Sequence, residues 1–220
     1  MTTLVRPRTG SGRERLPGLR TPMALVIAYV VLSVGVYVAR APYMHAWLAL
    51  MAPEIDWLLP ASLARKALEL VTAQGQELFS LDATTTVPLP CKNVVVPAAV
   101  VFFSTTLQSY ALLHPVVVYS ILVAWPAESR RARLIMLALG LPCVVISTSL
   151  DIPFVLAGLI RTSVLESCAP ERLSHDPSVI YCEFLHRGGR LGLAVAAAAV
   201  VALAAGNLSR MSLRRARASS

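Results

Sequence analysis

The chain has 220 residues, of which 56% are hydrophobic and only 15% are charged, and its mean hydropathy is +0.65. This composition is too apolar for an ordinary soluble domain and favours a protein that crosses a membrane several times. The net charge of +8 would suit nucleic acid, but the basic residues lie beside apolar runs. We interpret them as topology signals and expect no nucleic-acid partner.

The first two segments combine a basic tail with an apolar run. Residues 1–20 carry five arginines against the single acid Glu14, which predicts a disordered, cytoplasmic basic tail. Residues 21–41 are predicted as the first transmembrane helix. The Ala39 to Ala41 stretch also fits a signal-peptide cleavage site, but the charge balance across the chain works best if the helix is retained.

Residues 42–92 are mixed in composition and predict a small α/β unit outside the membrane. The spacing of apolar residues in 61–78 favours an amphipathic helix. From Phe79 to Leu89 the period changes to two, which predicts a short strand.

Residues 93–126 contain no Asp, Glu, Lys or Arg. As one helix they would extend about 50 Å, well beyond the roughly 30 Å of a bilayer core. A single overlong crossing and two cramped crossings both remain open. Gln108 and His114 would be polar side chains at membrane depth, and we expect them to face protein, with His114 bonded to a neighbouring helix.

The second half of the chain alternates short polar segments with apolar runs. A turn at 127–133 precedes a third predicted transmembrane helix at 134–160, and an outer loop at 161–189 precedes a fourth at 190–207. Residues 208–220 form a basic cytoplasmic tail. The expected fold class is therefore an all-α membrane protein with about four transmembrane helices and a small mixed α/β segment between helices one and two.

Charge counting orients these helices if residues 93–126 cross once. The two tails and the 127–133 turn hold twelve Lys or Arg residues, whereas the two opposite loops, counted with the flanking Arg40 and Arg190, hold eight against nine acids. This asymmetry predicts a multipass protein of the bacterial inner membrane with both termini in the cytoplasm. Asp151 stays within the membrane, where an acidic side chain suggests a proton or cation path and hence a small transporter. We expect no second buried charge to form a relay with it, and a hydrated, hydrogen-bonded Asp near the outer interface is the other interpretation.

Three of the four cysteines, Cys91, Cys168 and Cys182, would then face the oxidising compartment. We expect a disulfide between Cys168 and Cys182, with Cys91 left as a free thiol. The cysteines show no CxxC or CxxH pair, so no metal is predicted, and nothing in the sequence indicates a cofactor.

Cys91, Arg161 and His186 each fall at the outer end of a predicted helix. A thiolate held by a cation and served by a histidine base is what nucleophilic cysteine catalysis requires. In this order the residues resemble those of exosortases and archaeosortases, which are multipass membrane cysteine transpeptidases. The resemblance implies that Cys91 is the nucleophile, Arg161 the stabilising cation and His186 the base.

A second resemblance rests on Val87 to Pro90, the apolar stretch from Val94 to Trp125 and the turn Arg130-Arg131-Ala132-Arg133. These features are similar to small membrane proteins that accompany exosortase systems, which implies an accessory protein. Our preferred hypothesis is a non-catalytic accessory or assembly subunit that lies in the lipid bilayer and binds another membrane protein. The cysteine transpeptidase and the small transporter are the alternatives.

Overall fold

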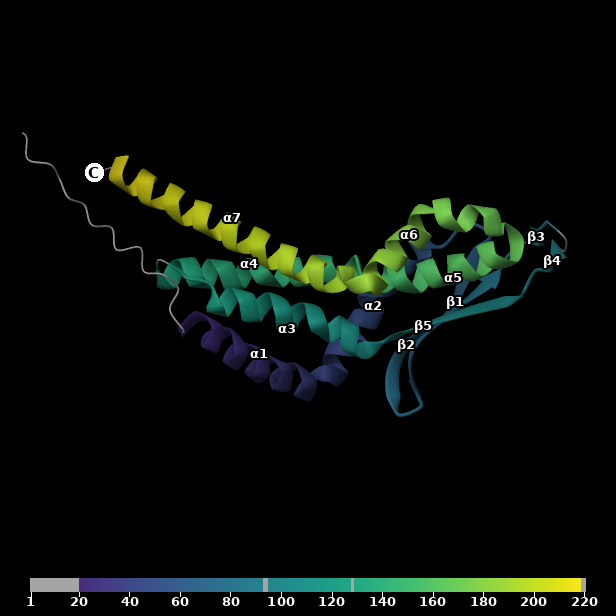
Figure 1. Cartoon of the computed structure of the whole chain (residues 1–220), viewed down its shortest axis with the longest axis horizontal. Coiled ribbons are helices and arrows are strands. Elements are labelled where there is room, and N and C mark those ends of the chain that lie inside the picture. The colour runs from purple at the N-terminus through teal and green to yellow at the C-terminus, as the bar shows by residue number, and fades with distance from the viewer. Residues whose placement is uncertain (1–19, 93–94, 128, 219–220) are drawn as a thin grey trace, which may run out of the picture.

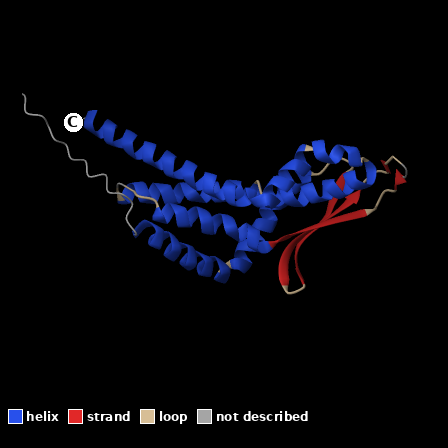
Figure 2. Ribbon diagram, viewed as in Figure 1, coloured by secondary structure: helices blue, strands red, loops and turns tan. Residues whose placement is uncertain are grey.

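The computed structural model describes residues 20–92, 95–127 and 129–218, so the predicted tail at 1–20 lies almost wholly outside the described residues. The described part is elongated. Helices occupy one end along the long axis, and an antiparallel sheet with further helices occupies the other (Figures 1 and 2).

The helical end consists of α1 (Arg20–Val38), α3 (Gln108–Ala124), α4 (Arg130–Ser149) and α7 (Arg190–Ala218). Their core joins α3, α4 and α7, because α7 contributes a stripe of small side chains that lets the helices approach closely. The start of α1, the α3–α4 turn and the end of α7 lie at the same end of the molecule (Figure 1). The buried stripe of α7 comprises Ala194, Ala198, Val201, Ala202 and Ala205.

The other end is built on a three-stranded sheet in the order β1 (Leu63–Ala73), β2 (Gln76–Thr85) and β5 (Val101–Leu107), with both pairs antiparallel. Alternate residues of β2, beginning with Phe79 and Leu81, are buried, which confirms the strand predicted from the period-two pattern. They pack against α2 (Arg40–Leu58) and α5 (Ile152–Cys168). A second, two-stranded sheet pairs β3 (Leu89–Pro90) with β4 (Val95–Val96).

Short helical segments connect α5 to α7. A 3₁₀ turn (Pro170–His175) leads into α6 (Pro177–Phe184), and a π-type turn (Leu185–Gly189) leads into α7. Gly188 in the last turn has φ +107°, a conformation that side-chain-bearing residues rarely adopt, so glycine allows the chain to change direction there.

The expected all-α class with four spans is wrong. Among the described residues, two helical runs are long and apolar enough to cross a membrane, Arg130–Cys168 across α4 and α5 and Pro177–Leu208 across α6 and α7. A third is added only if α1 and α2, bent by 76° relative to each other, count as one broken span. Two helices that the charge count treated as spans, α1 and α3, do not qualify alone, and α3 belongs to the shorter apolar helices. The three-stranded sheet also excludes the all-α class.

The largest local departure is in residues 93–126, which do not form one long helix. Val101–Leu107 is a strand, and the helix begins only at Gln108. The run from Val101 to Thr106 is β-branched or aromatic except for Ser104, which favours an extended backbone. Pairing with β2 gives that strand a hydrogen-bonded neighbour, so a tertiary contact settles an ambiguity that the apolar run alone left open.

The segment before the predicted strand also differs from expectation. The amphipathic helix expected in 61–78 is instead strand β1, paired with β2 along Leu63 to Ala73 with a bulge near Lys66. A helix lies further upstream, where α2 buries Met44, Trp47, Met51 and Ile55 at helical spacing. The outer loop expected at 161–189 is mostly helical, and α7 extends into the predicted tail as far as Ala218.

Candidate functional site

A buried cluster of charged and polar side chains lies where the helical end meets the sheet end. Asp151 occupies the break between α4 and α5 and is completely buried. His114 of α3 donates from Nε2 to Asp151 Oδ2 at 2.9 Å. Arg190, the first residue of α7, places its Nε 3.0 Å from Asp151 Oδ1 in an ion pair. One carboxylate therefore joins three separate stretches of the chain.

Arg190 has additional contacts that fix its orientation. Its guanidinium carbon lies 3.7 Å from the centre of the Tyr110 ring, and Nη2 donates to Thr106 Oγ1 at 3.4 Å. The planar guanidinium stacks on an aromatic face more readily than an ammonium group would. Arg190 is 4% exposed, so these partners, and not water, stabilise its positive charge.

Local sequence explains how each member of the cluster is positioned. The α4 helix ends at Ser149, and Pro153 in the first turn of α5 suits a helix start, so Asp151 falls at the junction. Gly188 makes the turn that sets Arg190 at the start of α7. His114 precedes Pro115 inside α3, and neither residue is exposed to solvent.

The cluster is more suited to stabilising the fold than to chemistry. It contains no nucleophile, and its three ionisable residues line none of the four cavities found near Trp125, Arg40, His45 and Phe184. Asp151 is balanced by Arg190 and hydrogen-bonded by His114, as a buried carboxylate requires. Three buried nitrogen atoms of the cluster, His114 Nδ1 and Arg190 Nε and Nη1, have no hydrogen-bond partner among the described residues, and neither has Asp151 Oδ1. The Asp151–Arg190 contact is therefore an ion pair without hydrogen-bond geometry.

The expected bond of His114 to a neighbouring segment is present, but the expectation for Asp151 was incomplete. It assumed no second buried charge, and Arg190 is that charge. The sequence does hold a signal for this pair. Arg190 is a lone basic residue at the start of an apolar run, and intramembrane charges usually pair with one another. Tyr110 and Thr106 carry no comparable signal.

The three predicted catalytic residues are each engaged elsewhere. Cys91 is bonded to Cys168, Arg161 Nε donates to Asp176 Oδ2 at 2.7 Å, and His186 Nδ1 donates to the carbonyl oxygen of Cys182 at 2.9 Å. The structure shows no contact of any of the three with another. A cysteine in a disulfide has no thiolate to act as a nucleophile.

The expected Cys168–Cys182 disulfide is a wrong pairing, because Cys168 is bonded to Cys91, 77 residues away in sequence. The loop that holds Cys91 lies against the end of α5, where Lys92 N–H also donates to the Cys168 carbonyl at 3.4 Å. Cys182 lies on α6 and packs against Gly158 of α5, so close that a Cβ added to Gly158 would lie 2.9 Å from Cys182 Cβ. Cys182 is 4% exposed and unpaired.

Asp176 organises the segment between α5 and α6. It caps the start of α6 by accepting hydrogen bonds from the backbone N–H groups of Ser178 and Val179, and it pairs with Arg161. Burial alone would raise the pKa of Asp176. The Arg161 guanidinium and the two backbone donors outweigh that cost and hold the pKa below its usual value.

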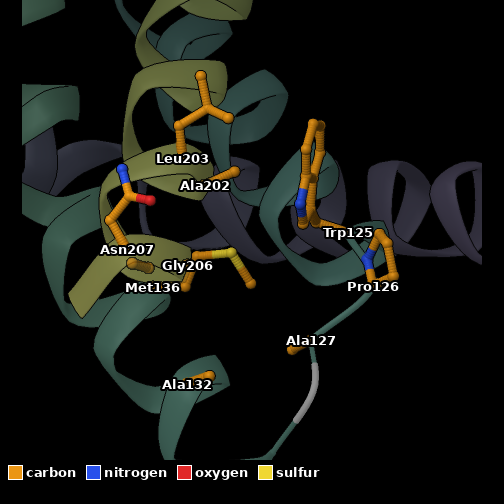
Figure 3. A pocket seen from close by; sticks show the side chains of 10 residues that line it. Trp125, Pro126, Ala127, Ala132, Met136, Ala202, Leu203, Gly206 and Asn207 are labelled. Atoms are coloured by element: carbon orange, nitrogen blue, oxygen red, sulfur yellow. The ribbon is translucent and has the colours of Figure 1, made fainter. Parts of the chain in front are cut away.

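Two cavities lie at opposite ends of the molecule's helical part. A small one of about 190 Å³ lies near the α3–α4 turn, where Trp125 and Pro126 face Ala202 and Leu203 of α7 (Figure 3). Its walls are mainly apolar. The other lies near the end of α1, is lined by Arg40 and Glu77, and includes the predicted intramembrane residue Gln108, which is 6% exposed at the first turn of α3.

No group of three His, Cys, Asp or Glu side chains among the described residues is placed to hold a metal ion. The chain matches no protein-family model, no curated protein and no solved structure. Its function must therefore be argued from its own residues.

Replacing Asp151 with Asn should destabilise the protein severely, because it leaves Arg190 buried without a counter-charge. Loss of one partner of a buried pair costs about 3–5 kcal/mol, which corresponds to a fall of about 10 °C in Tm for a chain of this size. Thermal unfolding of the detergent-solubilised protein measures this. Asp56→Asn is the matched control, because Asp56 pairs with Arg65 at an exposed site. Equal losses in both variants would contradict a special role for the cluster.

Thiol labelling tests the disulfide. Without reductant, a maleimide should modify neither Cys91 nor Cys168, and Cys91→Ser should release Cys168 for labelling. Cys182→Ser should leave Cys168 protected, because Cys182 is not its partner. Peptide mass spectrometry identifies the labelled residues. If Cys182→Ser instead exposes Cys168, the Cys91–Cys168 pairing is wrong.

The Asp176→Asn variant should show a pH-dependent stability difference from wild type. The lowered pKa of Asp176 means that its contribution is fully present above the unfolded value of about 3.8 and is lost as the pH falls through the folded pKa. The pair, with Arg161 38% exposed and Asp176 buried, contributes about 1 kcal/mol. The Tm difference measured between pH 3 and pH 8 should therefore be constant above pH 5 and begin to shrink as the pH falls below about 3.8. A difference that persists undiminished at pH 3 would exclude this carboxylate as its source.

Proposed function

We propose that the protein is a non-catalytic accessory subunit of a bacterial plasma membrane, held by its apolar helices and bound to another membrane protein. The observation that carries this proposal is the oxidised state of Cys91, which joins the outer loop to α5 by a disulfide. An enzyme of the transpeptidase class would need Cys91 as a free thiol. In this protein Cys91 instead attaches its loop covalently to the end of α5.

The two ends of the molecule differ in a way that supports the proposed orientation. Arg130 and Arg131 are exposed at the end that also holds the start of α1 and the end of α7 (Figure 1). The disulfide lies at the sheet end. Positive residues favour the cytoplasmic side, and disulfides persist in oxidising compartments. Both signals favour cytoplasmic termini and a sheet that faces the exterior.

The outward face of α7 offers a place for a partner helix. Gly192 and Ala196 are exposed one turn apart, flanked by Leu191, which is 51% exposed, and Val195, which is 45% exposed. The buried alanines of α7 form a different stripe, so this second small-residue stripe is not used within the chain. Small residues one turn apart permit close contact between membrane helices.

A shallow cavity continues this face toward the sheet end. Its volume is about 480 Å³, and Ile180 and Phe184 line it together with Gly188, Gly189 and Gly192. Ile180 and Phe184 are each at least half exposed. The resemblance of this chain to small proteins that accompany exosortases suggests a membrane transpeptidase of that class as the partner.

Site-specific photo-crosslinking in native membranes tests the proposal. A photoreactive residue at Ala196 should give one discrete adduct with a membrane protein, whereas the same residue at Ala198, which is completely buried, should give none. Gly192→Leu should lower the recovery of that partner at least tenfold, because no atom lies within 4 Å of an added Cβ, so the fold accepts the larger side chain while the partner does not.

Two outcomes would contradict this function. Adducts formed only between copies of this chain would make α7 a self-association surface. Undiminished partner recovery with Gly192→Leu would remove α7 from the interface.

A further inference from the structure

A pocket lined by several polar and charged residues lies where α1 ends, the β1–β2 hairpin turns and α3 begins. Its volume is about 480 Å³, within the usual range for small-ligand sites. It adjoins a second cavity of about 200 Å³ on the α2 side, and the two share the same four polar residues. These shared residues are Arg40, Thr72, Glu77 and Gln108.

Gln108 is a polar residue whose position in the fold is not explained by a hydrogen bond of its side chain. The residue is only 6% exposed, and no side-chain hydrogen bond joins its carboxamide to another of the described residues. It lines both cavities. Its amide atoms are not among the fully buried side-chain atoms without a partner, so the carboxamide is open to the space of the cavities. The open polar space beside Gln108 is where such a partner would bind.

The pocket favours an anion. The start of α3 points into it through Leu107, Gln108 and Ser109, and no side chain caps that helix. An uncapped helix N-terminus presents backbone N–H groups and the positive end of the helix dipole. Arg40 adds a guanidinium at the same wall, held over the Tyr37 ring with its central carbon 4.6 Å from the ring centre.

Glu77 adds a negative charge to the pocket, next to the positive charge of Arg40. Its carboxylate lies 3.3 Å from Arg40 Nη2, and both side chains are about 40% exposed, so each retains access to a ligand. A ligand that carries a phosphate beside an ammonium group would satisfy Arg40 and Gln108 with the first and Glu77 with the second.

The surroundings indicate where such a ligand comes from. The pocket opens at the last turn of α1, whose Val30, Val34 and Val38 are more than half exposed. An apolar face of this size needs a cover of hydrocarbon or protein. A phospholipid supplies acyl chains for α1 and a polar head at the depth where α1 ends.

We infer that this pocket binds the head group of a zwitterionic aminophospholipid, with the phosphate against Arg40, Gln108 and the start of α3 and the ammonium against Glu77. The bound lipid would cover the exposed side of α1 and hold the α1–α2 bend against the β1–β2 hairpin. This inference does not depend on a protein partner, and it requires only that α1 contacts lipid.

Native mass spectrometry of the full-length protein, purified in detergent and depleted of lipid, tests the inference. The protein is titrated with phosphatidylethanolamine, with phosphatidylglycerol and with free phosphoethanolamine. Wild type should bind one phosphatidylethanolamine at least tenfold more tightly than phosphatidylglycerol and should not retain free phosphoethanolamine. Gln108→Leu and Arg40→Gln should each weaken phosphatidylethanolamine binding at least tenfold.

Glu77→Gln separates the two halves of the head group. It should retain phosphate binding but remove the preference for phosphatidylethanolamine over phosphatidylglycerol. Glu183→Gln is the matched control, since Glu183 also pairs with an arginine on the surface, far along the chain from this pocket. Retention of the Cys91–Cys168 disulfide in every variant shows that each one folds.

Three results would overturn the inference. Unchanged lipid affinity in Gln108→Leu and Arg40→Gln would remove the pocket from lipid binding. Free phosphoethanolamine bound as tightly as the lipid would assign the pocket to a soluble ligand. A wild-type preference for phosphatidylglycerol would exclude the ammonium contact at Glu77.

Discussion

The ion pair between Asp151 and Arg190 is the contact on which the two halves of this molecule depend. Asp151 lies at the junction of α4 and α5, and Arg190 begins α7, so the pair joins the helical end to the sheet end. His114 adds α3 to the same carboxylate. A buried charge is tolerated only with partners, so any other arrangement of these helices would leave Asp151 or Arg190 uncompensated. The cluster thus favours one packing over its alternatives, whatever its net contribution to stability.

The sheet end is secured by a different kind of bond. The Cys91–Cys168 disulfide ties the loop between β3 and β4 to the end of α5, and the Arg161–Asp176 pair fixes the segment that follows. Together they give the sheet end a covalent link to the helical run Arg130–Cys168, which is long and apolar enough to cross a membrane. Small sheets bury little apolar surface, so this cross-link supplies restraint that their core alone does not.

The surfaces that remain uncovered suggest how such a scaffold acts. The outward stripe of α7 suits a second membrane helix, while the pocket at Gln108 suits a polar head group beside the exposed face of α1. These two surfaces lie on different helices, so a lipid and a partner protein need not compete. A lipid that holds the α1–α2 bend would also keep the sheet in a fixed position relative to the bilayer, where a partner's outer part would meet it.

The sequence by itself determined the apolar runs, the basic end, the strand at Phe79 to Thr85 and the exceptional position of Asp151. These features depend on composition and local period, which neighbouring residues encode. Only the tertiary structure decided that Val101–Leu107 is a strand, that Cys91 pairs with Cys168 and that Arg190 neutralises Asp151. An apolar run of β-branched residues fits a buried strand or a membrane helix equally well, and partners 39 or 77 residues apart meet only after the helices have packed. The spacing of residues in the sequence does not show which distant residues will meet. The packing of helices and sheet therefore decided the strand, the disulfide and the ion pair.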